Sequence, residues 1–159
     1  MSGSAVPVLT NPEILKKREE NRKIVEQYLA IEGNSVDERM ELFHEEIMYE
    51  IVHTEKLRPE RTCGYKKVKR RFEDNAKSWR EFSYNRVKLR GTEDPESFIA
   101  ECDGDGTIFN PMFTQPREYH NYYYIIFTLR EGKIWQLRQF TNPIKLMHDF
   151  WCDMPDFCK

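Results

Sequence analysis

The sequence predicts an α+β domain in which a strongly curved antiparallel sheet wraps around N-terminal helices and leaves a cone open at one end. Three observations support this fold class. Helix-period segments come early, a long run of strand-period segments follows Trp79, and the order lacks the regular strand–helix alternation of a parallel sheet. The chain has 159 residues, which is typical of one domain. We therefore expect a flexible leader at residues 1–10 and one domain at residues 11–159.

Charge and hydropathy exclude several classes of protein. The net charge is -2 and the pI is about 6.1, so the chain lacks the positive field expected of a nucleic-acid-binding protein. No apolar run is long enough to cross a membrane, and we expect no secretory signal because the first ten residues lack a basic segment followed by an apolar one. The four cysteines form no CxxC pair, which favours free thiols, no metal site and a cytoplasmic location.

The aromatic content is high for so polar a chain. Mean hydropathy is -0.78, yet 13% of the residues are aromatic, whereas a disordered chain of this polarity would lack aromatic residues. This combination predicts a small core together with a hollow or an interface lined by rings. The sequence contains no phosphate-binding loop and no dinucleotide fingerprint, so we expect no cofactor.

Three helices are expected in the first half of the chain. Asn11, followed by Pro12, is a good helix start, and the first helix should end near Ile31, with its charged first half in water. Ser35 opens a capping box that predicts a short second helix through Phe43. A third helix should follow Gly64, with one apolar face made by four residues: Val68, Phe72, Ala76 and Trp79.

The strands follow mostly in the second half, where the period changes to two. Glycine-containing links join neighbouring strands, and polar or proline-containing segments at 56–62 and 110–117 read as loops. The expected strands are 47–52, 83–90, 97–104, 118–130 and 133–140, and a short helix should cover 144–151.

Strand parity points to Gln139 as a pocket residue. In 133–140, Trp135, Leu137 and Gln139 share the face that should be buried, while Gln136 and Arg138 point the other way. A buried amide needs a hydrogen-bond partner, which a ligand could supply. The alternative is that Gln139 lies at a strand end and contacts water.

Polar residues also lie on or beside the apolar stripe of the third helix. Arg71 and Asn75 follow Val68 by three and seven positions. A guanidinium there could bind a carboxylate through two parallel hydrogen bonds. Alternatively, Arg71 extends into water or pairs with an internal acid such as Asp103 or Glu101.

The strand 118–130 has rings on both of its faces. Parity places Tyr119, Tyr123 and their even-spaced neighbours on one face, and His120, Tyr122 and Tyr124 on the other. We expect one face to line the cone and the other to pack against a second copy, which predicts a homodimer.

Several segments resemble the phenazine-biosynthesis A/B proteins, dimeric members of the ketosteroid-isomerase-like superfamily, over roughly residues 20–150. The matching positions are Asn21 to Tyr28, Gly64, Glu101, Cys102, Gly104, Gly106, Tyr119, Asn121, Arg138, Phe140, Asn142 and Pro143. The resemblance implies the cone-shaped fold known as nuclear-transport-factor-like, or as a cystatin-like α+β barrel. It also implies a protein that binds an amino-oxo-cyclohexene carboxylate and promotes the condensation of two such molecules.

The same resemblance implies an acid/base glutamate, together with a histidine and a serine on the third helix that place the substrate. Here those positions hold Gln139, Arg71 and Asn75. Glutamine cannot shuttle a proton and arginine stays protonated, so the chain departs from the family in its acid/base groups. The superfamily's catalytic tyrosine on the first helix corresponds to Tyr28, for which a core role is the alternative.

These arguments give a set of expected site residues. Gln139, Arg71 and His53, a histidine that follows the strand 47–52, are the expected catalytic residues. The expected substrate-binding residues are Asn75, Tyr119, Tyr28, Trp79, Tyr123 and Trp135.

Three functions remain open for such a pocket. The chain could be an enzyme that promotes condensation, isomerisation or dehydration, a non-catalytic small-molecule-binding protein, or a structural partner of an active paralogue with a collapsed pocket. General acid/base catalysis would require an inward-facing ionisable group. The candidates are His53, Glu50, Asp103 and His120.

Overall fold

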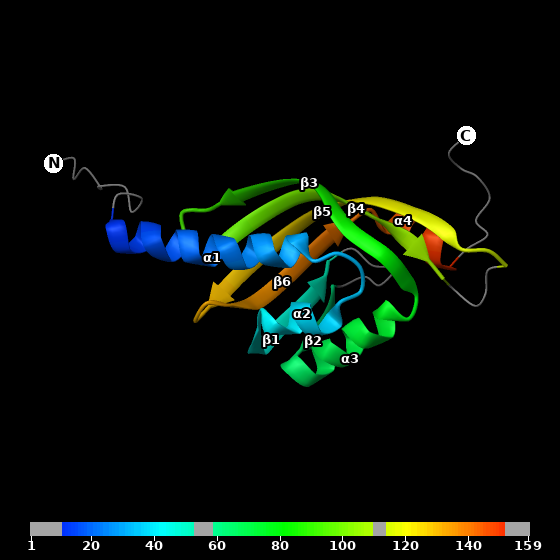
Figure 1. Ribbon diagram of the computed structural model, residues 1–159, viewed down its shortest axis with the longest axis horizontal. Helices are drawn as coiled ribbons and strands as arrows, with labels where there is room; N and C mark the ends of the chain where they lie inside the picture. The colour runs from blue at the N-terminus through cyan, green and yellow to red at the C-terminus, as the bar shows by residue number, and fades with distance from the viewer. Residues whose placement is uncertain (1–10, 53–58, 110–113, 152–159) are drawn as a thin grey trace.

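A single curved sheet of six strands dominates the computed structural model, which describes residues 11–52, 59–109 and 114–151 (Figure 1). The strand order is β2-β1-β6-β5-β4-β3. The elements in chain order are α1 (Pro12–Ala30), α2 (Val36–Glu41), β1 (Phe43–Ile51), β2 (Glu60–Cys63), α3 (Tyr65–Ala76), β3 (Trp79–Gly91), β4 (Ser97–Ile108), β5 (Arg117–Arg130), β6 (Lys133–Thr141) and α4 (Pro143–Trp151). The expected leader lies outside the described residues. Within those residues, no helix is long and apolar enough to span a bilayer.

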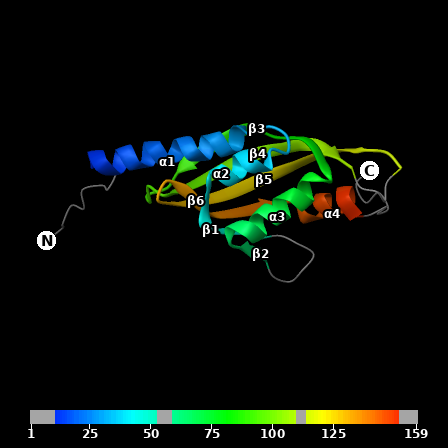
Figure 2. The ribbon, with the colours of Figure 1, turned by 60° about the horizontal axis from the view of Figure 1, so that its bottom comes forward.

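Pairing is antiparallel everywhere in this sheet except between β1 and β6, which run parallel. The expected antiparallel sheet is therefore mixed at one place. The helices α1, α2 and α3 lie on one side of the curved sheet, as Figures 1 and 2 show, and α1 contacts both β3 and β6. The concave side of the sheet and these helices together form the expected cone.

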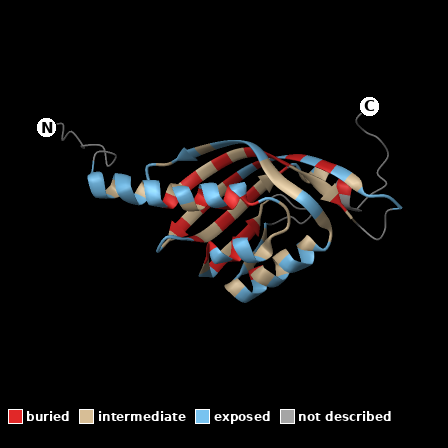
Figure 3. Cartoon of the chain, in the orientation of Figure 1, coloured by how far each residue is buried: buried red, intermediate tan, exposed pale blue. Residues whose placement is uncertain are grey.

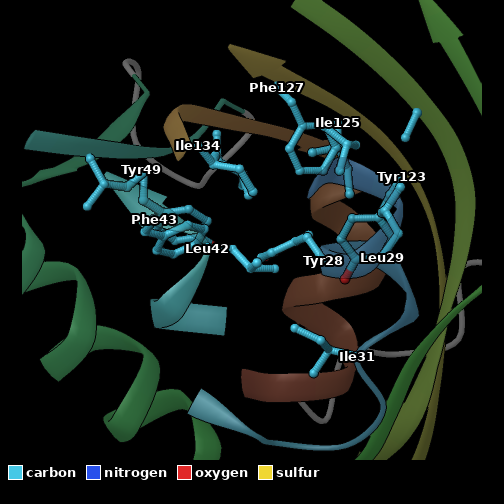
Figure 4. Packing of buried hydrophobic residues seen from close by; sticks show 14 of the residues in the cluster. Tyr28, Leu29, Ile31, Leu42, Phe43, Tyr49, Tyr123, Ile125, Phe127 and Ile134 are labelled. Carbon is cyan, nitrogen blue, oxygen red and sulfur yellow. The ribbon is translucent and has the colours of Figure 1, made fainter. Parts of the chain in front are cut away.

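The core lies between α1 and the concave face of the sheet. Buried and exposed residues alternate along β5, as expected for a strand with one covered face (Figure 3). Tyr28 of α1 packs against Phe43 and Phe127, with ring centroids 5.7 and 5.5 Å away (Figure 4). Each fully buried aromatic side chain of this kind contributes about 2–3 kcal/mol through burial, so these rings hold α1 on the sheet.

The first helix begins as the sequence predicts, because the Asn11 side chain accepts a hydrogen bond from the Glu13 N–H. Its charged first half does not lie wholly in water, however. Asn21 is buried and donates to the Pro95 carbonyl, and Arg18 donates to the Thr92 carbonyl. The turn between β3 and β4 reaches this part of the helix, which the sequence of the helix alone does not reveal.

The second and third helices are shorter than expected. In α2 the Ser35 hydroxyl donates to the Glu38 carboxylate, and the helix ends before Phe43, which begins β1. The third helix ends at Ala76, and Trp79 begins β3 instead of closing the helix. The rings of Phe43 and Trp79 still pack against the core, because one face of a helix and one face of a strand can bury the same residues.

The segment expected to form a loop at 56–62 contributes a strand. Glu60–Cys63 pairs with β1, from Met48↔Cys63 to Ile51↔Glu60. It is an edge strand, and its polar composition suits a strand with one unpaired side.

The strands β3 and β4 extend further than predicted, and β3 has two irregularities in its register. Glu81 and Arg86 adopt φ values of 54° and 52° next to these irregularities. Such bulges increase the bend of a strand, and β3 is strongly curved, as Figure 1 shows.

Candidate functional site

A cavity of about 600 Å³ opens between the concave face of the sheet and α3. Its wall takes residues from β1, β2, β3, β5 and β6 and from all of the helices α1 to α4. Six of the residues expected from the sequence line it: Tyr28, Arg71, Asn75, Trp79, Tyr123 and Gln139. The volume suits a small organic molecule.

Gln139 lies at the centre of a buried hydrogen-bond network. The Tyr49 hydroxyl donates to Gln139 Oε1 at 2.7 Å, and Gln139 Nε2 donates to the Tyr84 hydroxyl at 2.8 Å. Gln139 is buried at 8% exposure, so the alternative in which it sits at a wet strand end is wrong. The amide joins β1, β6 and β3 across the cavity wall.

The tyrosines of this wall are kept neutral by burial. Burial raises the pKa of Tyr28, Tyr49, Tyr84 and Tyr123. Arg39 and Arg71 lower the pKa of Tyr28 and Tyr49 respectively, but by less than burial raises it. These phenols can therefore donate hydrogen bonds, but they are poor bases and poor anions at neutral pH.

Arg71 enters the cavity wall from α3 and is held by the edge strand. Its Nη1 donates to Thr62 Oγ1 at 2.8 Å and lies 3.2 Å from Glu60 Oε1. The guanidinium carbon lies 5.0 Å from the centroid of the Tyr49 ring. Arg71 thus pairs with an acid, as one alternative held, but the acid is Glu60 and neither Asp103 nor Glu101.

Two expected binding residues do not line the cavity. Tyr119 lies behind the wall, where its hydroxyl bonds that of Tyr123 at 2.7 Å and its ring packs on Trp79. Trp135 was assigned to the wrong face. The pairing of β5 with β6 shifts between Thr128 and Leu129, which makes Trp135 a bulged residue, and its ring packs under Arg130.

Three of the four ionisable candidates for the pocket lie on the convex face of the sheet instead. Glu50 alternates with Tyr49 and lies on the convex face, where Arg61 and Arg138 bind it. Asp103 and His120 also lie on that face, His120 against Asp105 and Asp103. The fourth candidate, His53, lies outside the described residues. Among the described residues, the acids on the cavity lining are Glu60 and Asp74.

Sequence reasoning missed Tyr49 and Tyr84, the two phenols that bind Gln139. The alternation of Ile47, Tyr49 and Ile51 in β1 was a usable signal for Tyr49, since all three share one face. For Tyr84 the sequence offers no such signal, because the register irregularities of β3 interrupt its alternation. In the described part of the chain, no cluster of three metal-binding side chains occurs.

The convex face of the sheet carries exposed rings. Tyr122 and Tyr124 are 43% and 46% exposed, and their ring centroids lie 5.3 Å apart. Charged residues of both signs surround them, including the pair between Arg90 and Glu101. The predicted division of β5 into a buried and an outward-facing set of rings is therefore correct.

Comparison with known sequences identifies relatives over nearly the whole chain. The family model for phenazine biosynthesis protein A/B matches residues 9–158. Phenazine biosynthesis protein PhzA1 of Pseudomonas aeruginosa is 31% identical over 144 residues, which cover 90% of this chain and 88% of that protein. Phenazine biosynthesis protein PhzB of Pseudomonas fluorescens is 28% identical over 149 residues, covering 94% and 90% of the two chains.

Comparison with solved structures agrees. The crystal structure of the phenazine biosynthesis-related protein PhzB2 from Pseudomonas aeruginosa has a TM-score of 0.82 and 26% identity, covering 92% of this chain and 95% of that one. An NTF2-like protein from Burkholderia xenovorans has a TM-score of 0.63 at 14% identity, covering 82% and 95%, and supports the fold alone. The resemblance and the fold class inferred from the sequence are both confirmed.

Proposed function

Because the chain belongs to the phenazine biosynthesis protein A/B family, we propose that it binds a small cyclic carboxylate or carbonyl compound in its cavity. The bound compound then undergoes condensation, isomerisation or dehydration in secondary metabolism. The proposal includes a cytoplasmic location and no redox cofactor.

The observation that carries this proposal is the position of Arg71. Its side chain is 18% exposed at the cavity, and its contacts with Glu60 and Thr62 both use Nη1. The remaining N–H groups are suited to a ligand carboxylate, and a guanidinium can bind one through two parallel bonds. The guanidinium also lies over the Tyr49 ring, and these contacts restrain it, so less entropy is lost when it binds an anion.

The proposed catalysis relies on orientation and electrostatics. The position of Gln139 holds an amide, and Glu50, Asp103 and His120 lie on the other side of the sheet, so no carboxyl base is assigned at the centre of the cavity. Neutral phenols on the wall of the pocket can stabilise a developing oxyanion, and binding two reactants together supplies proximity. A purely structural partner would need no open cavity, and this feature favours a binding role.

The proposal is tested by replacing Arg71. We expect Arg71→Met to weaken the binding of benzoate and cyclohex-1-ene-carboxylate about tenfold or more, the scale of one lost charge-assisted contact. Isothermal titration calorimetry measures the dissociation constant. Lys66→Met is the matched control, because Lys66 is exposed on the same helix and does not line the cavity. An unchanged dissociation constant in Arg71→Met would remove Arg71 from the site.

Catalysis and passive binding are separated by turnover. We expect the wild-type protein to accelerate the condensation of an amino-ketone carboxylate in single-turnover assays, and Arg71→Met to lose that acceleration. Tight binding without acceleration would favour the non-catalytic binding protein.

We also propose that two copies of the chain associate through the convex face of the sheet. Support comes from the exposed pair Tyr122 and Tyr124, which forms an aromatic centre within a charged rim. The rim carries both signs, as in the pairs of Arg90 with Glu101 and of Arg86 with Asp103, which allows a face to complement its own copy.

A further inference from the structure

The amide of Gln139 gives the hydrogen bonds of the cavity wall a direction. An amide has one oxygen that accepts and one nitrogen that donates. In this structure the oxygen takes the hydrogen of Tyr49, and the nitrogen donates to the oxygen of Tyr84. The two phenols are therefore not equivalent, since the Tyr49 hydrogen is already used and the Tyr84 hydrogen is not used by Gln139.

The Tyr84 ring has Tyr28 as a neighbour within the protein, with the two ring centroids 6.5 Å apart. The guanidinium carbon of Arg39 lies 6.0 Å from the centroid of the Tyr28 ring, and the charge of Arg39 acts to lower the pKa of Tyr28. Both tyrosines line the cavity, but Tyr28 is 1% exposed, whereas Tyr84 is partly exposed. A ligand oxygen in the cavity can therefore accept the Tyr84 hydrogen, which Gln139 does not use.

We propose that the Gln139 amide, because it donates to the Tyr84 oxygen and does not accept from it, leaves the Tyr84 hydroxyl free to act as a hydrogen-bond donor, so that the cavity selects ligands with a carbonyl or enolate oxygen. This inference rests on the proposed function and adds the group that is recognised at a second point, away from Arg71. A chain of bonds that all run in one direction polarises each member, which strengthens the final donor. Burial keeps the pKa of Tyr84 above its usual value, so the hydroxyl stays protonated and available.

The direction of the hydrogen bonds predicts that Gln139→Glu, a change of almost the same shape, disturbs ligand binding more than Gln139→Met does. In Gln139→Glu, an ionised carboxylate accepts from both Tyr49 and Tyr84, so the Tyr84 hydrogen turns inward and the donor is lost. In Gln139→Met, neither phenol is held and the Tyr84 hydrogen stays free. The glutamate variant should therefore lose recognition of a carbonyl, while the methionine variant, which also lacks the amide, should keep it.

The probe is acetophenone, isotopically labelled at its ketone carbon, because a neutral ketone is not repelled by the carboxylate that Gln139→Glu introduces. Infrared difference spectra report donation directly, since a hydrogen bond lowers the stretching frequency of the carbonyl. We expect a lowered frequency in the wild type and in Gln139→Met, and an unshifted band in Gln139→Glu and Tyr84→Phe.

Binding of acetophenone should also be about tenfold weaker in Gln139→Glu and in Tyr84→Phe than in the wild type. Acidification that protonates the introduced carboxylate should restore the lowered frequency, since a carboxylic acid can donate to Tyr84.

Each outcome is decisive. A lowered frequency that persists in Gln139→Glu or in Tyr84→Phe, or that disappears in Gln139→Met, would overturn the inference. So would a wild-type protein that binds benzoate through Arg71 but does not bind acetophenone, and in that case the carboxylate proposal stands. If acetophenone binds as described while Arg71→Met leaves benzoate binding unchanged, the carboxylate proposal fails and the carbonyl site remains. If the glutamate variant does not fold, Tyr84→Phe alone still tests the inference.

Discussion

At Gln139 an amide joins phenols that lie 90 and 55 positions away in the chain. An amide does not titrate, so the hydrogen bonds at the centre of the cavity keep their direction over the whole physiological pH range. A carboxyl at the same place would accept hydrogen bonds when ionised and could donate one when protonated, and this change with pH suits proton transfer. The residue that stands here instead suits constant recognition of one oxygen.

A second residue-scale feature is the buried acid Glu50 on the convex face. Glu50 is 1% exposed, and Arg61 and Arg138 bind its two oxygens at 2.7 and 2.8 Å. Burial acts to raise the pKa of this carboxyl, but the hydrogen bonds of Arg138 and Arg61 outweigh burial and lower it. The ionised form is therefore favoured by folding.

This arrangement makes stability depend on pH. Glu50→Gln should lower the free energy of unfolding by about 1–3 kcal/mol near neutral pH, because it removes two charge-assisted bonds whose arginine partners remain partly solvated. Since the folded-state pKa is lowered, the contribution of Glu50 is complete above its unfolded pKa and disappears as pH falls through the folded-state value. Urea unfolding of both proteins between about pH 7 and about pH 3 measures this. A difference that stays constant down to the lowest pH would contradict it.

At the scale of the element, β4 passes very close to its neighbours. Gly104 has no room for a side chain, because a Cβ atom there would overlap the Tyr123 ring and lie 2.9 Å from Phe82 Cζ. Both rings line the cavity. The absence of a side chain at Gly104 therefore allows the rings of Tyr123 and Phe82 to pack directly against β4.

Gly104→Ala should cost about 1–3 kcal/mol of stability through overpacking and should displace the Tyr123 ring. Gly91→Ala is the control, since its Cβ would meet its nearest atom at 3.7 Å, an ordinary contact. Chemical denaturation compares the two variants with the wild type. Equal stabilities for the two variants would show that Tyr123 yields without cost.

The elements also show which parts of the fold local sequence can predict. The start of α1 was predictable because Asn11 caps a helix whose signals are adjacent in the chain. The edge strand β2 was not, because its place depends on pairing with β1 and not on its own polar residues. Gln139 was found by strand parity, whereas the same parity misplaced Trp135, since one bulge between Gln139 and the start of β6 reverses the alternation.

At the scale of the whole molecule, the curved sheet has two faces with different roles. The concave face encloses the cavity, and the convex face carries Tyr122 and Tyr124. If two copies meet on the convex face, Tyr124→Asp should weaken dimerisation about tenfold or more by placing a charge in the aromatic centre. Analytical ultracentrifugation measures the dissociation constant of the dimer.

The control for this substitution is Leu15→Asp. Leu15 is 44% exposed, like Tyr124, but it lies on α1 on the other side of the sheet, so its replacement should leave the dimer intact. A wild-type protein that is monomeric at micromolar concentration would contradict the proposed association.

The parallel pairing of β1 with β6 has a consequence for how the molecule is made. In the sheet of the described residues, β1 and β2 join the remaining strands through β6, which is the last of the six strands in chain order. During synthesis, β1 therefore cannot pair with the rest of the sheet until β6 has been made. Contacts between such distant segments slow folding, because the intervening chain must be ordered before they form. The cavity wall that joins Tyr49 to Gln139 can thus form only once β6 is present, and a chain truncated before β6 lacks this binding site.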